Sequence, residues 1–166
     1  MERAAAHGFP VPRVDEVRDD ALVLELVEGP TMDEVLRRRP WLMRVHARLL
    51  ASLHRQLAPT GLVHFDLNPT NVLLSTHGPV VLDWTNAGEG DPAVDVALTY
   101  VILATSGGLL GQAFARSFAR HVDVDEGLEA ACEYRLADPN VTDGERARVR
   151  RLLLRRAARR AGRSRA

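Results

Sequence analysis

Four polar residues stand at the ends of two short apolar segments. His64 and Asp66 come before the first segment, Asn71 follows Asp66 by five residues, and Asp83 interrupts the second segment, VVLDW. Phosphoryl transfer from a nucleotide needs a carboxylate that orients and deprotonates the attacking hydroxyl, and hard oxygen ligands that hold Mg²⁺ against the phosphates. An Asp, an Asn and a second Asp in this order supply those groups. The spacing therefore predicts one site for a divalent metal and a hydroxyl group.

Each of these residues also has a structural interpretation. Asp66 alone is a typical turn residue, and Asn71 alone is a typical cap at the start of a strand. The combination with Asp83 favours the chemical interpretation over coincidence. For His64 a structural role is favoured over proton transfer. His54 lies on an apolar helical face and is predicted to be a core residue.

The two apolar segments are predicted to form the hairpin that positions these side chains. Residues 71–75 and 80–84 have the composition of short strands, and the intervening THGP has the composition of a turn. A helix is expected before them over residues 41–57, because Pro59 and Gly61 follow a run of apolar residues at helical spacing. The expected apolar stripe of that helix consists of Leu42, Val45, Leu49, Leu53 and Leu57.

The remaining elements are predicted from caps and breaks. Residues 1–7 are expected to end a helix, and residues 14–27 to form two short strands joined by a polar turn. Thr31 and Glu34 have the spacing of a capping box at the start of a short helix. After residue 91 the chain is expected to be helical almost to its end, with breaks at residues 107–108 and 137–144. The last helix is expected to begin after Thr142 and to end at Gly162.

Composition limits the class of protein and its compartment. A chain of 166 residues with 46% hydrophobic content is long enough for one core and too short for two full domains. Cys132 is the only cysteine, so no disulfide forms within the chain and the cytoplasm is the expected compartment. Residues 96–115 carry no charge, but Gly107 and Gly108 interrupt them, which favours buried helix over a membrane span. The histidines and the single Cys show no zinc-binding pattern.

Charge is distributed unevenly along the chain. Residues 1–143 carry 12 Arg against 21 acidic residues, and residues 144–166 carry 10 Arg against Glu145 alone. A basic tail can bind nucleic acid or an anionic membrane, or it can form a solvated helix that faces an acidic body. No aromatic residue in residues 144–166 is available to stack on bases, so nucleic-acid binding is disfavoured and the tail has no assigned role.

Several segments resemble one known family. HFDLNPTN is similar to an H-G-D-x-x-P-x-N catalytic loop, VVLDW to an apolar strand ending in Asp-Trp, and GDPAVDVA to a G-D-P-x-x-D-[LV]-A segment. GFPVPRV, LVLELVEG and LASLH resemble an entry strand, a nucleotide hinge and the helix before the catalytic loop. These segments resemble the aminoglycoside phosphotransferase and choline kinase-like family, which is related to the protein kinases. The resemblance extends over about residues 5–104.

The resemblance implies a fold and a domain organisation. The expected fold is α+β and protein kinase-like, made mainly of the helical C-terminal lobe with a short catalytic hairpin and hinge strands, and with the N-terminal lobe largely absent. Residues 1–166 would form a single kinase-like domain. Within it, residues 1–30 would be the remnant of the N-terminal lobe and the hinge, residues 31–141 the helical catalytic lobe, and residues 142–166 a basic C-terminal helix.

The resemblance also implies roles for individual residues. Asp66 would be the catalytic base, His64 would brace its loop, and Asn71 and Asp83 would hold Mg²⁺. ATP or GTP would be the phosphate donor, and a hydroxyl group of a small molecule the acceptor. The adenine edge would meet the backbone of Glu25, Leu26 and Val27.

Other positions bear on loop support and substrate choice. By the same resemblance, Asp91 and Asp95 would buttress the catalytic loop. Phe65 stands where the family frequently has Gly, a departure that would constrict the substrate side. A cationic acceptor would suit the acidic residues of the following segment, although a solvated helix face explains them better; these are Asp123, Asp125, Glu126, Glu129 and Glu133.

Parts of the phosphate-binding machinery are missing from the sequence. The family normally has a loop over the phosphates, a strand Lys that pairs with them and a helical Glu that holds the Lys. This sequence has no Lys and no glycine-rich loop. Three alternatives follow: a fragment of an active enzyme, a compact enzyme that uses Arg and Mg²⁺, or an inactive relative that binds a ligand or partner.

Overall fold

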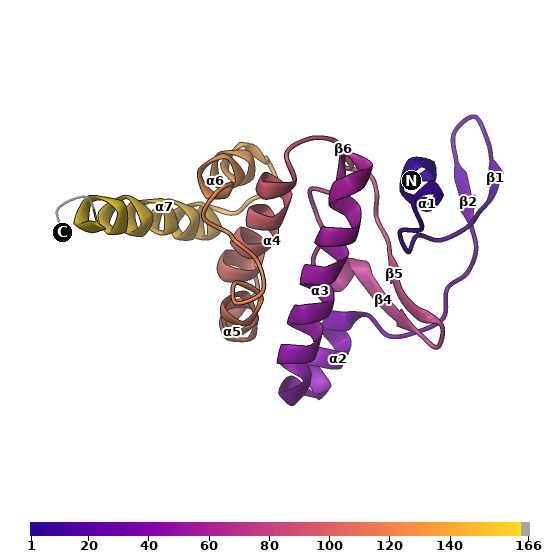
Figure 1. Ribbon diagram of the computed structural model, residues 1–166, viewed down its shortest axis with the longest axis horizontal. Coiled ribbons are helices and arrows are strands. Elements are labelled where there is room, and N and C mark those ends of the chain that lie inside the picture. Colours follow the sequence, from indigo (N-terminus) through magenta and orange to yellow (C-terminus); the bar gives the residue numbers. More distant parts are fainter. Residues whose placement is uncertain (164–166) are drawn as a thin grey trace.

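Helices occupy most of the chain, and short strand pairs lie beside them (Figure 1). The computed structural model describes residues 1–163, with side-chain environments to residue 156. The helices are α1 (Glu2–Ala6), α2 (Met32–Arg38), α3 (Met43–Leu57), α4 (Pro92–Ser106), α5 (Gly108–Phe118), α6 (Leu128–Ala137) and α7 (Asp143–Arg163). Short 3-10 turns lie at Pro40–Leu42, Ala58–Thr60 and Pro69–Asn71. This composition confirms the expected α+β class.

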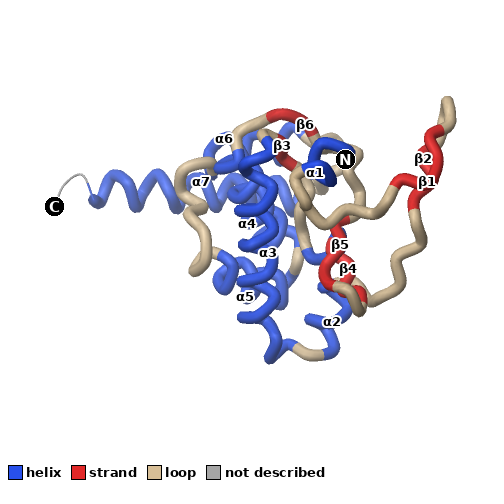
Figure 2. Tube along the Cα trace, turned by 45° about the vertical axis from the view of Figure 1, so that its right-hand side comes forward, coloured by secondary structure: helices blue, strands red, loops and turns tan. Residues whose placement is uncertain are grey.

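The strands of the described residues form three antiparallel pairs. These are β1 (Val14–Val17) with β2 (Leu22–Leu24), β3 (Leu62–Val63) with β6 (Gly88–Glu89), and β4 (Val72–Ser75) with β5 (Gly78–Val81). The β1–β2 pair lies at the edge of the molecule, away from helices α3–α7, whereas β4 and β5 lie close to α2 (Figure 2). The predicted hairpin over residues 71–84 is therefore present, with β5 shorter than expected.

The larger hydrophobic core surrounds α3. It joins α2, α5 and the β4–β5 hairpin, and Val72 and Val81, which lie opposite each other in that hairpin, are both fully buried. On α3 the buried residues include Leu50, Leu53 and Leu57, but Val45 is 62% exposed. Positions four residues apart drift by about 40° per step around a helix, so Val45, three steps before Leu57, leaves the face that Leu53 and Leu57 share.

A second core cluster holds the C-terminal helices together. It contains apolar residues of α4, α6 and the first half of α7, including the fully buried Val149. The predicted capping box is confirmed at Thr31, whose hydroxyl accepts the Glu34 N–H. At the expected start of the last helix, the Thr142 hydroxyl accepts the Glu145 N–H at 3.3 Å. α7 extends to Arg163, the last described residue, which is one position beyond the end predicted at Gly162.

The uncharged segment 96–115 divides between α4 and α5. Seven residues of α4 are buried, among them Leu98 and Val101, so its apolar surface faces other helices. Among residues 1–163, no helix has both the length and the apolar character needed to cross a membrane. The interpretation as buried helix is confirmed.

The segment that leads from β2 to α2 lies against β4. The Leu74 N–H donates to the Pro30 carbonyl at 2.9 Å, and Thr31 forms an isolated bridge with Leu73. Gly29 has a φ of 150°, and a Cβ built on it would lie 2.5 Å from the Leu74 carbonyl oxygen. The close approach of two backbones therefore requires glycine at this position.

Gly29→Ala is expected to lower the free energy of unfolding by about 2 kcal/mol or more, because it adds both backbone strain and a clash with β4. Urea unfolding followed by circular dichroism measures the change. Gly88→Ala is the matched control, since nothing lies within 4 Å of its added Cβ and its φ is negative or extended. Equal losses in the two variants would contradict the assignment of this contact.

Candidate functional site

The loop between β3 and β4 is closed by its own side chains around Asp66. Asn68 Nδ2 donates to Asp66 Oδ1 at 2.9 Å, and Asn71 Nδ2 donates to Asp66 Oδ2 at 2.9 Å. The same Asn71 amide nitrogen also lies 2.9 Å from the Asp66 carbonyl oxygen. Both carboxylate oxygens are thus oriented by amide donors, while the side chain stays half-buried and open on one side.

Asp83 follows β5 at the same end of the hairpin as Asn71. The Leu82 N–H donates to the Asn71 carbonyl at 2.9 Å, which extends the β4–β5 ladder by one step beyond Val72 and Val81. Asp83 then takes a left-handed φ of 56°, so the strand ends at Val81 and not at residue 84 as predicted. Its Oδ1 accepts the Thr85 hydroxyl at 2.8 Å. The structure thus brings Asp66, Asn71 and the Asp83 backbone to one end of the hairpin.

His64 connects the loop to the strand that precedes Asp83. The side chain is fully buried, and Nε2 lies 3.0 Å from the Leu82 carbonyl oxygen, so this nitrogen donates the hydrogen bond. The ring also meets Trp84 edge-on, with 4.9 Å between centroids. Burial lowers the pKa of His64, outweighing the nearby carboxylates of Asp95 and Asp66, which act in the opposite direction. The contacts are those of a neutral structural histidine.

A buried polar network supports the loop from below. Asp95 Oδ1 accepts the Phe65 N–H at 2.6 Å, and its other oxygen lies 3.1 Å from His54 Nδ1. Thr99 donates its hydroxyl hydrogen to the Leu67 carbonyl at 2.6 Å. Because that hydroxyl has one hydrogen, Thr99 must accept the hydrogen bond from His54 Nε2, 3.0 Å away. Residues of α3 and α4 therefore hold backbone groups on both sides of Asp66.

The sequence indicated part of this network. Asp95 was expected to buttress the loop, and it does contact the loop directly. His54 was expected only to be a core residue, and Thr99 was not predicted at all. The available signal was the spacing of Asp95 and Thr99, four residues apart on one helical face. Asp91 does not reach the loop: it caps α4 by accepting the Ala93 N–H at 2.8 Å, so the expectation of a second buttress is wrong.

The ionisation of Asp95 follows from its partners. Burial by itself favours the neutral acid, but the hydrogen bond and charge of His54 and the Phe65 N–H together hold the pKa of Asp95 below its ordinary value. The carboxylate is 3% exposed. The loop therefore rests on a buried charge that is stabilised only by these specific contacts.

The expected hinge lies apart from these residues. The Glu25 N–H donates to the Arg13 carbonyl at 3.0 Å, and Glu25 Oε1 accepts the Arg13 N–H at 2.9 Å. Leu26 is 89% exposed. In the described part of the chain, the backbone N–H groups of Leu26 and Val27 have no protein acceptor. No hydrogen bond between described residues joins Glu25, Leu26 or Val27 to Asp66, Asn71 or Asp83.

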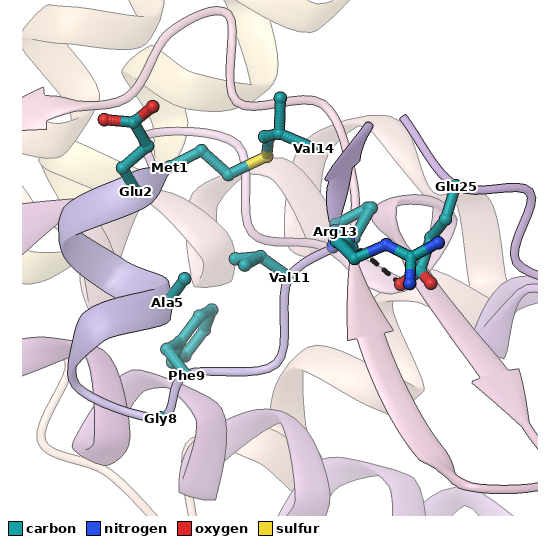
Figure 3. A pocket seen from close by; sticks show the side chains of 10 residues that line it. Met1, Glu2, Ala5, Gly8, Phe9, Val11, Arg13, Val14 and Glu25 are labelled. Atoms are coloured by element: carbon teal, nitrogen blue, oxygen red, sulfur yellow. Dashed lines mark hydrogen bonds between the residues drawn. The ribbon is translucent and has the colours of Figure 1, made fainter. Parts of the chain in front are cut away.

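Two hollows lie in the described part of the chain, and one of them borders Asp66. The first, of about 500 Å³, lies between α1 and the start of β1, where Phe9, Val11 and Val14 point toward the open space and Arg13 meets Glu25 at one side (Figure 3). The second, of about 570 Å³, has Asp66 in its wall and is otherwise lined by Phe65, Asn86 and residues of α4, α6 and the segment after α6. Asp66, which the sequence singled out, therefore lines a space large enough for a small molecule.

Asp95→Asn is expected to lower the free energy of unfolding by about 3 kcal/mol, because it removes the charge that His54 is arranged to meet while leaving the site buried. Asp91→Asn is the matched control at the start of the same helix, with an expected loss of about 1 kcal/mol or less because Asn also caps helices well. Chemical denaturation of both variants provides the comparison. A loss for Asp95→Asn no larger than for Asp91→Asn would argue against the network.

The contribution of Asp95 is also expected to depend on pH. Its folded-state pKa lies below the ordinary value of 3.8, so its stabilisation is complete above about pH 4 and is lost as the pH falls through the folded-state pKa. The difference in unfolding free energy between the wild type and Asp95→Asn should thus shrink as the pH is lowered below about 4. A difference that grows as the pH falls below about 4 would contradict a lowered pKa for Asp95 in the folded protein.

Comparisons with known proteins show the family of the chain. The model of the phosphotransferase enzyme family matches residues 18–134. A protein of Archaeoglobus fulgidus named as a probable serine/threonine-protein kinase BUD32 homolog is 34% identical over 75 residues, which are 45% of this chain and 35% of that protein. The serine/threonine-protein kinase PknL of Mycobacterium tuberculosis is 37% identical over 99 residues, 54% of this chain and 23% of that kinase. The chain thus matches about a quarter to a third of the length of these relatives. The chain belongs to the phosphotransferase enzyme family and has the expected α+β, protein kinase-like fold.

Proposed function

We propose that this protein transfers the γ-phosphate of ATP or GTP to a hydroxyl group of a small molecule. The observation that carries the proposal is the arrangement of Asp66: its carboxylate is fixed by two amide donors, it lines a hollow, and its partner Asn71 is paired across the hairpin with the residue before Asp83. Family membership and kinase-named relatives support phosphoryl transfer as the general chemistry.

In this proposal Asp66 is the catalytic base. Its oxygens keep lone pairs beyond those that the Asn68 and Asn71 amides use, so the carboxylate can accept the hydrogen of an acceptor hydroxyl that enters the hollow. A carboxylate whose orientation is set in advance loses little freedom when the substrate binds. His64 braces the loop through Leu82 and does not itself move a proton.

The residues proposed as metal ligands fit Mg²⁺. Asn71 uses its amide nitrogen on Asp66, so its Oδ1 receives only a 3.5 Å contact from the Thr70 hydroxyl. Asp83 Oδ2 accepts no hydrogen bond from the described residues, and the side chain is exposed. One amide and one carboxylate oxygen suit a cation that completes its shell with water and phosphate. When bound, Mg²⁺ would neutralise phosphate charge. Within residues 1–163, no three His, Cys, Asp or Glu side chains gather into a metal site of another kind.

The proposed nucleotide contact is the backbone of Glu25, Leu26 and Val27. The unused N–H groups of Leu26 and Val27 are donors of the kind that the adenine edge requires. The chain continues from these residues to Gly29 and there lies against β4. The proposed nucleotide contact is therefore connected to the hairpin that follows Asn71.

One observation favours a second candidate, a kinase-fold module that binds a ligand or partner without catalysis. The sequence contains no Lys, so the residue that pairs with the nucleotide phosphates in kinases is missing from it. Each contact to the transferred phosphoryl group is worth several kcal/mol in the transition state, and its loss slows turnover more than it weakens binding.

Titration calorimetry with Mg·ATP, followed by a phosphotransfer or ATPase assay, tests the proposal. Asp66→Asn should lower turnover by about 100-fold or more with little change in nucleotide affinity, because it removes only the base. Asp83→Ala should weaken nucleotide binding in the presence of Mg²⁺ and have a smaller effect in its absence. Asp91→Asn serves as the control for a conservative change at a helix cap.

The outcomes separate the two candidates. Turnover that depends on Asp66 supports the phosphotransferase. Nucleotide binding with no turnover sensitive to Asp66 supports the binding module. Failure to bind either ATP or GTP, with or without Mg²⁺, would contradict both.

A further inference from the structure

Two buried histidines lie at the loop between β3 and β4, and their hydrogen bonds differ. His64 Nε2 donates to the Leu82 carbonyl, whereas its Nδ1 is buried without a partner among the described residues. His54, on α3, uses both ring nitrogens: Nδ1 lies 3.1 Å from Asp95 Oδ2, and Nε2 lies 3.0 Å from the Thr99 hydroxyl oxygen. These partners determine how many ring protons each histidine carries.

The Thr99 hydroxyl fixes a proton on Nε2 of His54. The hydroxyl has one hydrogen, and the Leu67 carbonyl oxygen, 2.6 Å away, can only accept. That hydrogen is therefore used on Leu67, and the hydroxyl oxygen must accept a hydrogen bond from His54 Nε2. The reverse arrangement would leave two oxygen atoms 2.6 Å apart with no hydrogen between them.

Asp95 fixes a second proton, on Nδ1 of the same ring. Its Oδ1 accepts the Phe65 N–H, and its Oδ2 lies beside His54 Nδ1, so the ionised carboxylate needs a donor there. The pKa of Asp95 lies below its ordinary value, which favours the ionised form. The neighbouring ring of Phe118 on α5, with 5.7 Å between centroids, offers His54 no competing acceptor. Both ring nitrogens of His54 are therefore donors.

The backbone of Phe65 is held in place through this network. Its φ of 59° is left-handed, a conformation that glycine adopts readily and that a residue with a Cβ adopts only under restraint. Phe65 forms an aromatic pair with Tyr134, with 4.9 Å between ring centroids and 15° between planes, and its N–H is bound by Asp95. Strain beside a reactive carboxylate persists only where the surroundings enforce it.

We propose that His54 is a buried imidazolium that positions the loop bearing the catalytic base. The cation and the Asp95 carboxylate form a neutral pair in the interior, where either charge alone would be costly. A proton on Nδ1 alone would break the link to Thr99, and a proton on Nε2 alone would break the link to Asp95. Two ring protons thus secure the loop at both Phe65 and Leu67. The positioning role rests on the proposed function, whereas the protonation state does not.

NMR spectroscopy of the full-length chain labelled with ¹⁵N-histidine counts the ring protons directly. At about pH 7, where an ordinary imidazole is mostly neutral, His54 is expected to show two ring N–H signals and His64 one. Both rings are buried, which slows exchange of these protons with water. His54→Gln assigns the signals by removing them. A single ring N–H on His54 would overturn the proposal.

A matched pair of variants at Thr99 tests how the proton acts on the loop. Thr99→Val keeps the shape of the side chain but removes the hydroxyl, so His54 should retain one ring N–H signal. The ¹⁵N shift of the Asn68 amide should also change, because that amide shares a peptide group with the Leu67 carbonyl. Thr99→Ser keeps a hydroxyl and should preserve both signals. Circular dichroism checks that each variant folds.

Turnover separates positioning from packing. In the ATPase assay, Thr99→Val should lower turnover about tenfold or more with little change in Mg·ATP affinity, because the loop and not the nucleotide contact is displaced. Thr99→Ser should retain turnover. His46→Gln is the control: it changes a second buried histidine of α3, whose Nδ1 has no partner among the described residues, and should leave turnover unchanged.

The results distinguish this inference from the proposed function. Equal turnover in Thr99→Val and the wild type would overturn the positioning role, even with two ring protons on His54. Absence of turnover in the wild type would count against the phosphotransferase. In that case, loss of one ring signal and a shifted Asn68 amide in Thr99→Val would still support the imidazolium, and an unchanged spectrum would overturn it.

Discussion

One buried carboxylate determines where the chemistry can take place. Asp95 accepts the Phe65 N–H, and through His54 and Thr99 the same network reaches the Leu67 carbonyl. Asp66 lies between these two backbone groups, so helices α3 and α4 hold the backbone on either side of it, and the Asn68 and Asn71 amides orient its carboxylate. Because the network is buried, each member is satisfied only while the others remain in place.

A second constraint fixes the opposite side of the site. The β4–β5 register places Asn71 beside Leu82, and His64 binds the Leu82 carbonyl from the other direction. These hydrogen bonds thus hold the segments around His64, Asn71 and Leu82 together. The Asp66 carboxylate is oriented by the side-chain amides of Asn68 and Asn71, whereas Asn71 Oδ1 receives only a 3.5 Å contact and Asp83 Oδ2 accepts no hydrogen bond from the described residues.

The parts of the fold that the sequence predicted are those that depend on local patterns. The Thr31 capping box, the hairpin around the THGP turn and the grouping of Asp66 with Asn71 follow from spacing along the chain. What could not be predicted depends on contacts between helices. Asp95 and Thr99 share one helical face, but the sequence does not show that the Thr99 hydroxyl reaches the Leu67 carbonyl. Val45 is exposed because positions four residues apart drift around the helix and leave the face of α3 that is buried. Asp91 and Asp95 lie four residues apart in similar sequence contexts. Asp91 caps α4, whereas Asp95 accepts a hydrogen bond from the loop, and the sequence does not show which of the two reaches the loop.

The left-handed backbone at Phe65 has a consequence for how this protein can change. Replacement by glycine would relax the main chain and at the same time remove half of the aromatic pair. Backbone strain and side-chain packing are therefore opposed at this residue. The gain from a relaxed main chain is set against the loss of the ring's contact with Tyr134, so the two contributions offset each other in the free energy of unfolding.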